Sequence, residues 1–188
     1  VVLDVVRRNG SLGRMQIARL THLTAQAIAN IVDELVSEKL LMETGRLRSG
    51  RGQPPIQFAV NPDGAMTIGI EVASDHIVST VLDLSGQPRS KQITPVRDTS
   101  PSQVIAHLRA ELDAVRAAFK APLLGIGVVM PGPFEIEGMT SVGPTTLPGW
   151  ADIDAASLLT GACGEQVTVE NDANAAAVGE RLFGAGHS

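Results

Sequence analysis

Aromatic residues are nearly missing from this chain of 188 residues, which has 3% aromatics, one Trp and no Tyr. A core must therefore be built from aliphatic side chains, and these are plentiful because 44% of the residues are hydrophobic. Charged residues make up 19% of the chain, so its composition is that of a globular protein and excludes a disordered one. The length is enough for one or two domains.

Cysteine and long apolar runs are also scarce. The single Cys163 excludes an intramolecular disulfide, and such cysteine usage is typical of the reducing cytoplasm, where we expect this protein. No apolar run reaches the roughly 20 residues that a membrane-spanning helix needs. We therefore expect no membrane partner.

The net charge of −5 is unevenly spread along the chain. Residues 1–62 carry eight Lys and Arg against five Asp and Glu, a balance of +3. Residues 63–188 carry seven against 15, a balance of −8. A basic head on an acidic body indicates that only the head meets a polyanion.

The head begins with two short predicted helices. In the first, Val2, Val5 and Val6 have helical spacing, and Asn9-Gly10 ends it. The second covers Arg14–Thr21. A short turn over residues 21–24 leads into a third helix.

The third predicted helix is strongly two-sided. Thr24 is placed to cap it through the side-chain hydroxyl. Apolar residues then follow at i, i+3, i+4 and i+7, which predicts a buried stripe of Ile28, Ile31, Val32 and Leu35. The opposite face carries only polar side chains, namely Gln26, Asn30, Asp33 and Ser37.

A basic hairpin follows the three helices. One strand is predicted from Leu40, a returning strand alternates over Ile56–Val60, and a basic Gly-rich loop joins them. This order predicts a winged helix-turn-helix DNA-binding domain over residues 1–62. The alternative is a three-helix interaction domain with a solvated polar face.

In the DNA-binding interpretation, the N-terminal part of the third helix enters the major groove of operator DNA. The amides of Gln26 and Asn30 can pair with adenine N6 and N7. Arginines of the hairpin loop reach phosphates or a minor groove. The candidate DNA-binding residues are Thr24, Gln26, Ala27, Asn30, Arg46, Arg48 and Arg51.

Strands and helices alternate after the turn at residues 61–64, which predicts an α/β domain over residues 63–188. Strands are expected over residues 67–72, 77–84, 91–95, 123–130 and 166–169. The strand at 123–130 is continuously apolar and is predicted to be buried on both faces. One helix is expected from a capping box at Ser100 to about Lys120, with Ile105, Leu108, Leu112, Val115 and Phe119 inward, and another over residues 173–183.

Four segments of this domain, in this order, resemble the ROK family of repressors, open reading frames and sugar kinases. They are IGIEV at 68–72, GIGVVMPGP at 125–133, LPGW at 147–150 and ENDANAAAVGE at 170–180. The resemblance spans about residues 65–186, and the head resembles the one found in the family's repressor branch. It implies the first part of an actin-like, ribonuclease-H-type domain.

Kinases of this family hold a phosphate with an Asp-x-Gly-Gly-Thr turn, onto which residues 71–75 align. Here Ala73 and Ser74 add side chains where close approach to the phosphate is needed, and Asp75 places a carboxylate there. Two like charges about 4 Å apart at an effective dielectric near 20 repel by about 4 kcal/mol, or about a thousandfold in affinity. We therefore expect no enzyme activity.

The resemblance implies that the sugar side is better kept. Asn171 and Asp172 match the family's sugar-binding pair, in which the Asp is the general base of the kinases. Their alternative role is to cap the following helix. Pro131 and Gly132 shape the pocket floor, and Thr146 stands where many members have Asn.

The family's later motifs, including its zinc-binding cluster, are expected beyond the stretch present here, so no metal or cofactor is expected within it. The leading hypothesis is a homodimeric repressor of carbohydrate genes, controlled by a sugar or sugar phosphate. A sugar kinase with an added DNA-binding head is the alternative, and a protein-binding adaptor with two relic sites is a third possibility.

Overall fold

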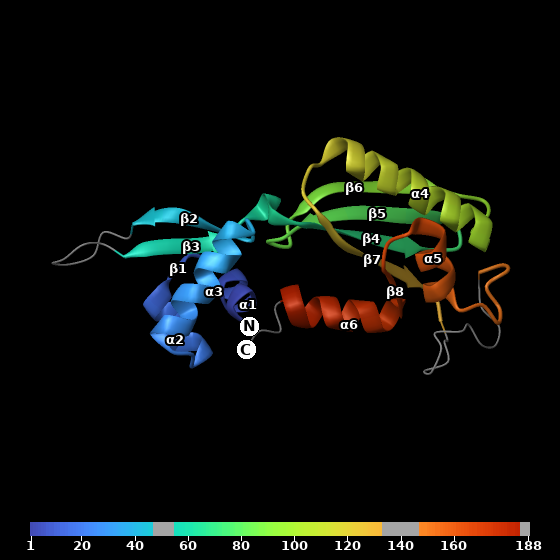
Figure 1. Cartoon of the computed structure of the whole chain (residues 1–188). Helices are drawn as coiled ribbons and strands as arrows, with labels where there is room; N and C mark the ends of the chain where they lie inside the picture. The colour runs from blue at the N-terminus through green and yellow to red at the C-terminus, as the bar shows by residue number, and fades with distance from the viewer. Residues whose placement is uncertain (47–54, 133–146, 185–188) are drawn as a thin grey trace. The chain divides into compact units, whose positions relative to one another are not determined.

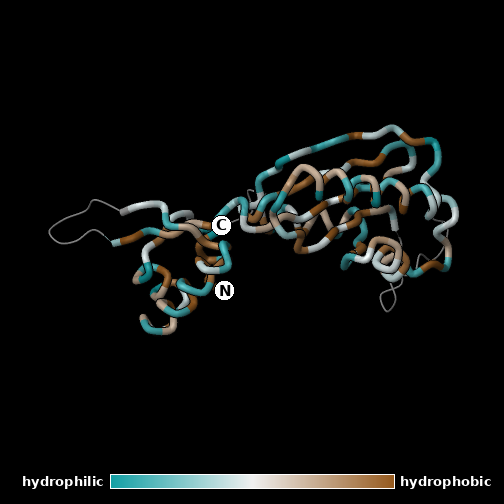
Figure 2. The backbone as a smooth tube through the Cα atoms, turned by 45° about the horizontal axis from the view of Figure 1, so that its top comes forward, coloured by the Kyte–Doolittle hydropathy of each residue, from teal (hydrophilic) through white to brown (hydrophobic). Residues whose placement is uncertain are grey.

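The structure, a computed structural model, describes residues 1–46, 55–132 and 147–184 (Figure 1). The chain forms two compact units. The first comprises Val1–Met66 together with Asp83–Gln87, and the second comprises Thr67–Leu82 and Pro88–Ser188. The hydropathy-coloured backbone shows hydrophobic stretches within each unit and hydrophilic stretches along the outer loops (Figure 2).

Every helix and strand predicted for the head is present in the first unit. Its helices are α1 (Val2–Asn9), α2 (Arg14–Thr21) and α3 (Ala25–Ser37). Its antiparallel sheet has the order β1-β3-β2, with β1 at Leu12–Gly13, β2 at Leu41–Arg46 and β3 at Ile56–Val60. The two-residue β1 lacks a sequence signal of its own, because only its pairing with β3 defines it.

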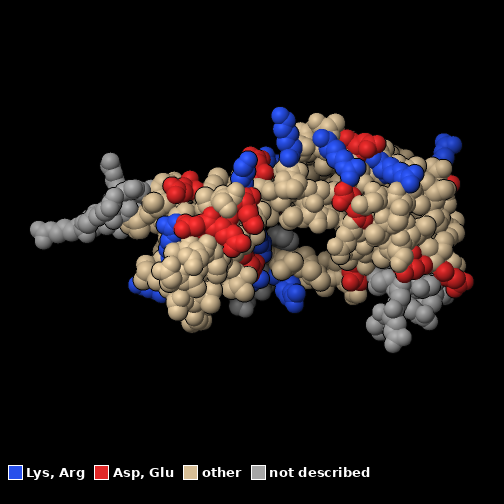
Figure 3. Space-filling model, viewed as in Figure 1, with Lys and Arg blue, Asp and Glu red and all other residues tan. Residues whose placement is uncertain are grey.

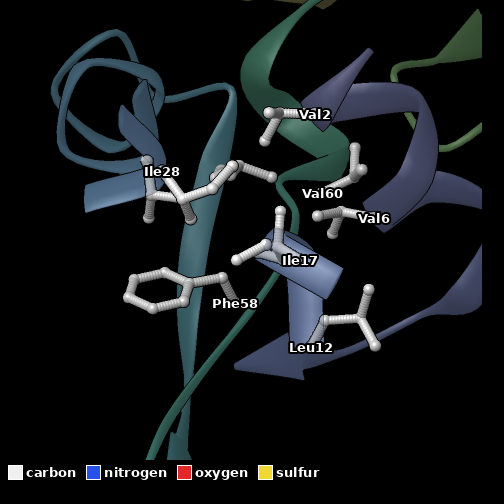
Figure 4. Close-up of a cluster of buried hydrophobic side chains, with 10 residues drawn as sticks. Val2, Val6, Leu12, Ile17, Ile28, Phe58 and Val60 are labelled. Carbon is white, nitrogen blue, oxygen red and sulfur yellow. The ribbon is translucent and has the colours of Figure 1, made fainter. Parts of the chain in front are cut away.

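Aliphatic side chains and one Phe form the core of the first unit (Figure 4). Ile17, Ile28 and Phe58, from α2, α3 and β3, are fully buried in this cluster. Of the predicted stripe on α3, Ile28 and Val32 are fully buried, while Ile31 and Leu35 pack at the edge of the cluster. Leu84, in the segment Asp83–Gln87, also packs against this cluster.

A five-stranded sheet of order β6-β5-β4-β7-β8 organises the second unit. Its strands are β4 (Met66–Val72), β5 (His76–Asp83), β6 (Pro88–Pro95), β7 (Leu123–Met130) and β8 (Val167–Asn171). The β5–β6 pair is antiparallel and the β7–β8 pair is parallel. The predicted burial of β7 on both faces is wrong, because its residues alternate from Ile126 onward between a buried and a more exposed face.

Three helices accompany this sheet: α4 (Pro101–Ala118), α5 (Ala155–Cys163) and α6 (Asp172–Phe183). The predicted capping box at Ser100 does not form, since the Ser100 side chain makes no capping hydrogen bond. The buried stripe of α4 begins at Val104 instead of the predicted Ile105. Helix α5 has no counterpart among the predicted elements. Within the described ranges, no helix has both the length and the apolar character that a bilayer crossing demands.

A close backbone contact follows β3, where Pro62–Gly64 form a short 3-10 helix, η1. A Cβ added at Gly64 would lie 2.5 Å from the carbonyl oxygen of Lys39, whereas one added at Gly127 in β7 would meet nothing within 4 Å.

We predict that Gly64→Ala lowers the free energy of unfolding by about 1–3 kcal/mol, because the backbone at Lys39 or at Gly64 must move to make room for the added methyl group. The control Gly127→Ala should change it by less than about 0.5 kcal/mol. Equal effects in urea denaturation would contradict the packing described at η1.

Candidate functional site

The turn between α2 and α3 fixes and exposes the N-terminus of α3. His22 ends α2 in the left-handed region, with φ of 58°. The Thr24 hydroxyl oxygen then accepts a hydrogen bond from the Ala27 backbone N–H at 3.2 Å, so the predicted cap is present. Thr24 and Gln26 are exposed and Ala27 is half-buried. The start of α3 is therefore both capped and accessible.

Two predicted DNA-contacting amides are joined on α3. The Gln26 Nε2 donates to the Asn30 Oδ1 at 3.2 Å, and both side chains are exposed. We call Gln26, Asn30, Asp33 and Ser37 the polar face of α3; all four are exposed. The link between the amides leaves an acceptor on Gln26 and donors on Asn30, which is the complement of an adenine edge.

The predicted wing arginines lie at or beyond the end of β2. Arg46 is the last residue of β2, beyond a β-bulge between Glu43 and Gly45, where Gly45 has φ of 114°. Arg48 and Arg51 fall outside the described residues. Acidic side chains gather on the visible face of the first unit where α3 lies (Figure 3). The first turns of α3, ahead of Asp33 and Glu34, carry no carboxylate.

In the second unit, most predicted sugar-binding residues lie at one edge of the sheet. Met130 pairs with Asn171 in the parallel register of β7 and β8, so Pro131-Gly132 and Asp172 leave the sheet together. The carboxyl ends of parallel strands are where α/β domains bind ligands. Thr146 lies outside the described residues.

Asn171 is the N-cap of α6. Its Oδ1 accepts hydrogen bonds from the backbone N–H groups of Ala173 at 2.8 Å and Asn174 at 3.2 Å. Among the described residues no hydrogen bond uses its amide nitrogen, so two donors remain for a ligand. Asp172 is exposed, and its Oδ1 accepts from the Ala173 N–H at 2.8 Å. Capping and ligand binding are thus compatible at this pair.

Glu170 completes this edge and was not among the predicted site residues. Its Oε1 accepts from the Asn174 Nδ2 at 2.9 Å and from the Asn171 backbone N–H at 2.8 Å. These hydrogen bonds lower the pKa of Glu170, the bond from Asn174 contributing most. Glu170 lies on β8 and Asn174 in the first turn of α6, so helical spacing provided no sequence signal for this contact.

The turn aligned with the kinase phosphate motif is a tight link between β4 and β5. The Ala73 N–H donates to the His76 carbonyl at 2.9 Å, which closes the turn. The Asp75 carboxylate is exposed and lies 2.7 Å from the His76 Nδ1, and this hydrogen bond lowers the pKa of Asp75. A negative charge therefore stands in the turn at neutral pH.

The LPGW segment supports the fold. Trp150 is buried, with 1% of its surface exposed, and its Nε1 donates to the Thr99 carbonyl at 2.7 Å. Leu147 is equally buried. Trp150 is thus a packing residue that anchors the segment before α4.

The sequence profile of the ROK family matches residues 67–188. The chain belongs to the ROK family.

Among curated proteins, the chain is similar to xylose repressors. It is 27% identical over 194 residues to the one from Bacillus subtilis strain 168, covering 98% of this chain and 48% of the relative. It is 28% identical over 188 residues to that of Caldicellulosiruptor bescii, covering 98% of this chain and 47% of the relative. The chain spans about half the length of the curated relatives that it matches.

Among solved structures, a ROK family transcriptional regulator, described as a homolog of the E. coli MLC protein, has the same fold over 97% of this chain and 47% of its own. Its TM-score is 0.73 at 20% identity. A polyphosphate/ATP-glucomannokinase from Arthrobacter sp. strain KM is 29% identical, with a TM-score of 0.56, over 66% of this chain and 51% of its own. The regulator therefore matches nearly the whole chain and the kinase about two thirds.

The Thr24 cap gives a test of the α3 N-terminus. We predict that Thr24→Ala lowers the free energy of unfolding by about 1 kcal/mol, because the Ala27 N–H loses its acceptor. Thr24→Ser keeps the hydroxyl and should retain most of the stability. Thermal melts of both variants measure the difference. A melting temperature equally lowered by both substitutions would contradict the capping role.

Proposed function

We propose that this chain is part of a sugar-responsive transcriptional repressor. Residues 1–62 bind operator DNA and residues 63–188 bind the sugar. One observation carries the proposal: a capped, exposed α3 presents the linked amides of Gln26 and Asn30, in a chain whose curated relatives are named xylose repressors. Such a regulator works in the cytoplasm, beside the DNA.

Each DNA-binding residue has a distinct task in this proposal. Gln26 and Asn30 read base edges in the major groove, while Thr24 and Ala27 hold the N-terminus of α3 against the sugar-phosphate backbone of the DNA. Arg46, Arg48 and Arg51 reach phosphates or a minor groove. Two copies of the chain in a homodimer would bind two half-sites.

The sugar contacts the edge formed by the ends of β7 and β8. Asn171 donates from its amide nitrogen, Asp172 accepts from a sugar hydroxyl, and Pro131, Gly132 and Thr146 shape the pocket. The sugar changes operator affinity only if it binds one geometry of the dimer better than another. The names of the relatives make xylose the first sugar to test.

A sugar kinase is the second candidate function, favoured by the glucomannokinase similarity and by Asp172 at the general-base position. The exposed, ionised Asp75 and the closed turn at Ala73 oppose it, because both hinder a phosphate group. An ADP-release assay with xylose, hexoses and N-acetylhexosamines separates the two candidates. Turnover would overturn the repressor proposal for this unit.

The wing arginines should set the salt dependence of DNA binding. We predict that Arg48→Ala with Arg51→Ala weakens binding to every duplex and reduces the slope of log affinity against log salt by about 0.9 per lost phosphate contact. Arg116→Ala is the control for the loss of one positive charge outside the wing, because Arg116 lies on α4 and pairs with Glu165, which precedes β8. An unchanged slope in the double variant would remove the wing from the interface.

The Asn171–Asp172 pair should control the response to sugar in the full-length protein. We predict that Asp172→Ala abolishes sugar-induced release of DNA, because a hydroxyl of the sugar loses its hydrogen-bond acceptor. The affinity for DNA in the absence of sugar should be unchanged. Asn171→Asp keeps the capping oxygen but removes the amide donors, so it should preserve thermal stability and lose the response. If both variants still respond to sugar, the pair serves only as a helix cap.

A further inference from the structure

Arg14, the first residue of α2, joins three elements of the first unit. Its guanidinium carbon lies 4.7 Å from the centroid of the Phe58 ring on β3. Its Nη2 donates to the Asp33 Oδ1 on α3 at 2.5 Å. Its Nε is buried and has no hydrogen-bond partner among the described residues. The polar bonding of this side chain is therefore directed at Asp33.

Asp33 stands on the polar face of α3, in line with the amides. It follows Gln26 by seven residues and Asn30 by three, which places all three on one side of a helix. The rise from Asn30 to Asp33 is about 4.5 Å along the axis, well within the Debye length of about 8 Å at physiological salt. A free carboxylate here would repel any phosphate that approaches the amides.

The stacking on Phe58 restricts Arg14 at this position. Phe58 is fully buried in the core cluster, and the guanidinium carbon of Arg14 lies 4.7 Å from the centroid of its ring, a cation–π contact. The ring restricts the arginine, and the restricted arginine holds Asp33. The Asp33 side chain is 67% exposed, so the ion pair adds little to stability on its own.

We propose that Arg14 is a positioning residue for DNA binding, which cancels the charge of Asp33 on the polar face of α3 and ties that face to β3. The inference rests on the proposed DNA-binding function. It explains how an acidic residue stands beside the base-reading amides without excluding a polyanion. Arg14 acts through Asp33 and needs no contact with DNA.

Charge removal and packing are separated by four variants of the whole chain. Arg14→Met keeps an apolar cover on Phe58 but leaves Asp33 unpaired. Asp33→Asn removes the carboxylate, and the double variant Arg14→Met with Asp33→Asn restores the net charge of the pair. Glu38→Gln is the control, because it removes the same charge at the C-cap of α3. Binding is measured by fluorescence anisotropy on a duplex selected from a random-sequence pool by the unsubstituted chain, with thermal melts alongside.

The charge-cancelling role predicts a definite order of affinities. Arg14→Met should bind roughly two- to tenfold more weakly than the unsubstituted chain, as expected for one unpaired charge near a phosphate. Asp33→Asn should bind more tightly by a similar factor, and the double variant should return to the original affinity. Glu38→Gln should change affinity by less than Asp33→Asn.

Three results would overturn the inference. A double variant as weak as Arg14→Met would show that Arg14 contacts DNA itself. An Asp33→Asn variant of unchanged affinity would show that the carboxylate does not face DNA. Because the Asp33 side chain is exposed, this variant should fold even if Arg14→Met does not. A drop in melting temperature with no change in affinity would leave Arg14 a packing residue. Failure of the unsubstituted chain to select any duplex would instead count against the proposed function.

Discussion

The buried cluster of the first unit is the constraint on which its proposed activity depends. Ile28 and Val32 are fully buried against the cluster that contains Ile17 and Phe58, and burying each such side chain contributes about 1.5–3 kcal/mol. Because Ile28 and Val32 turn one face of α3 toward the core, Gln26 and Asn30 on the opposite face are exposed to solvent. Thr24 then fixes where the helix begins. Core packing therefore determines which side chains of α3 are exposed to solvent.

In the second unit, the parallel pairing of two strands positions the candidate site residues. The register of β7 and β8 brings Pro131 and Asn171 to one edge, where the first turn of α6 is capped. The β4–β5 turn has a different character, because Asp75 is held ionised by His76. In the proposed function, this arrangement would let the unit sense a sugar without transferring phosphate to it.

Sequence patterns predicted the features that are local in the chain. The bounds of α1 and α2, the Thr24 cap and the stripe on α3 follow from spacing within a few residues. Helix α5 was not predicted because AASLLTGAC lacks a clear apolar period, and β1 was not predicted because its pairing with β3 alone defines it. The one-sided burial of β7 and the contacts of Arg14 depend on partners distant in sequence. Periodicity carries no information about such partners.

Base reading by α3 is tested most directly by selecting duplexes from a random-sequence pool with the chain and with its Gln26→Ala variant. We expect the unsubstituted chain to enrich a defined sequence containing A·T pairs. The variant should lose the preference at particular positions while still binding duplexes in general, because phosphate contacts remain. An identical enriched sequence for both proteins, or none for either, would contradict the assignment of α3 as the base-reading helix.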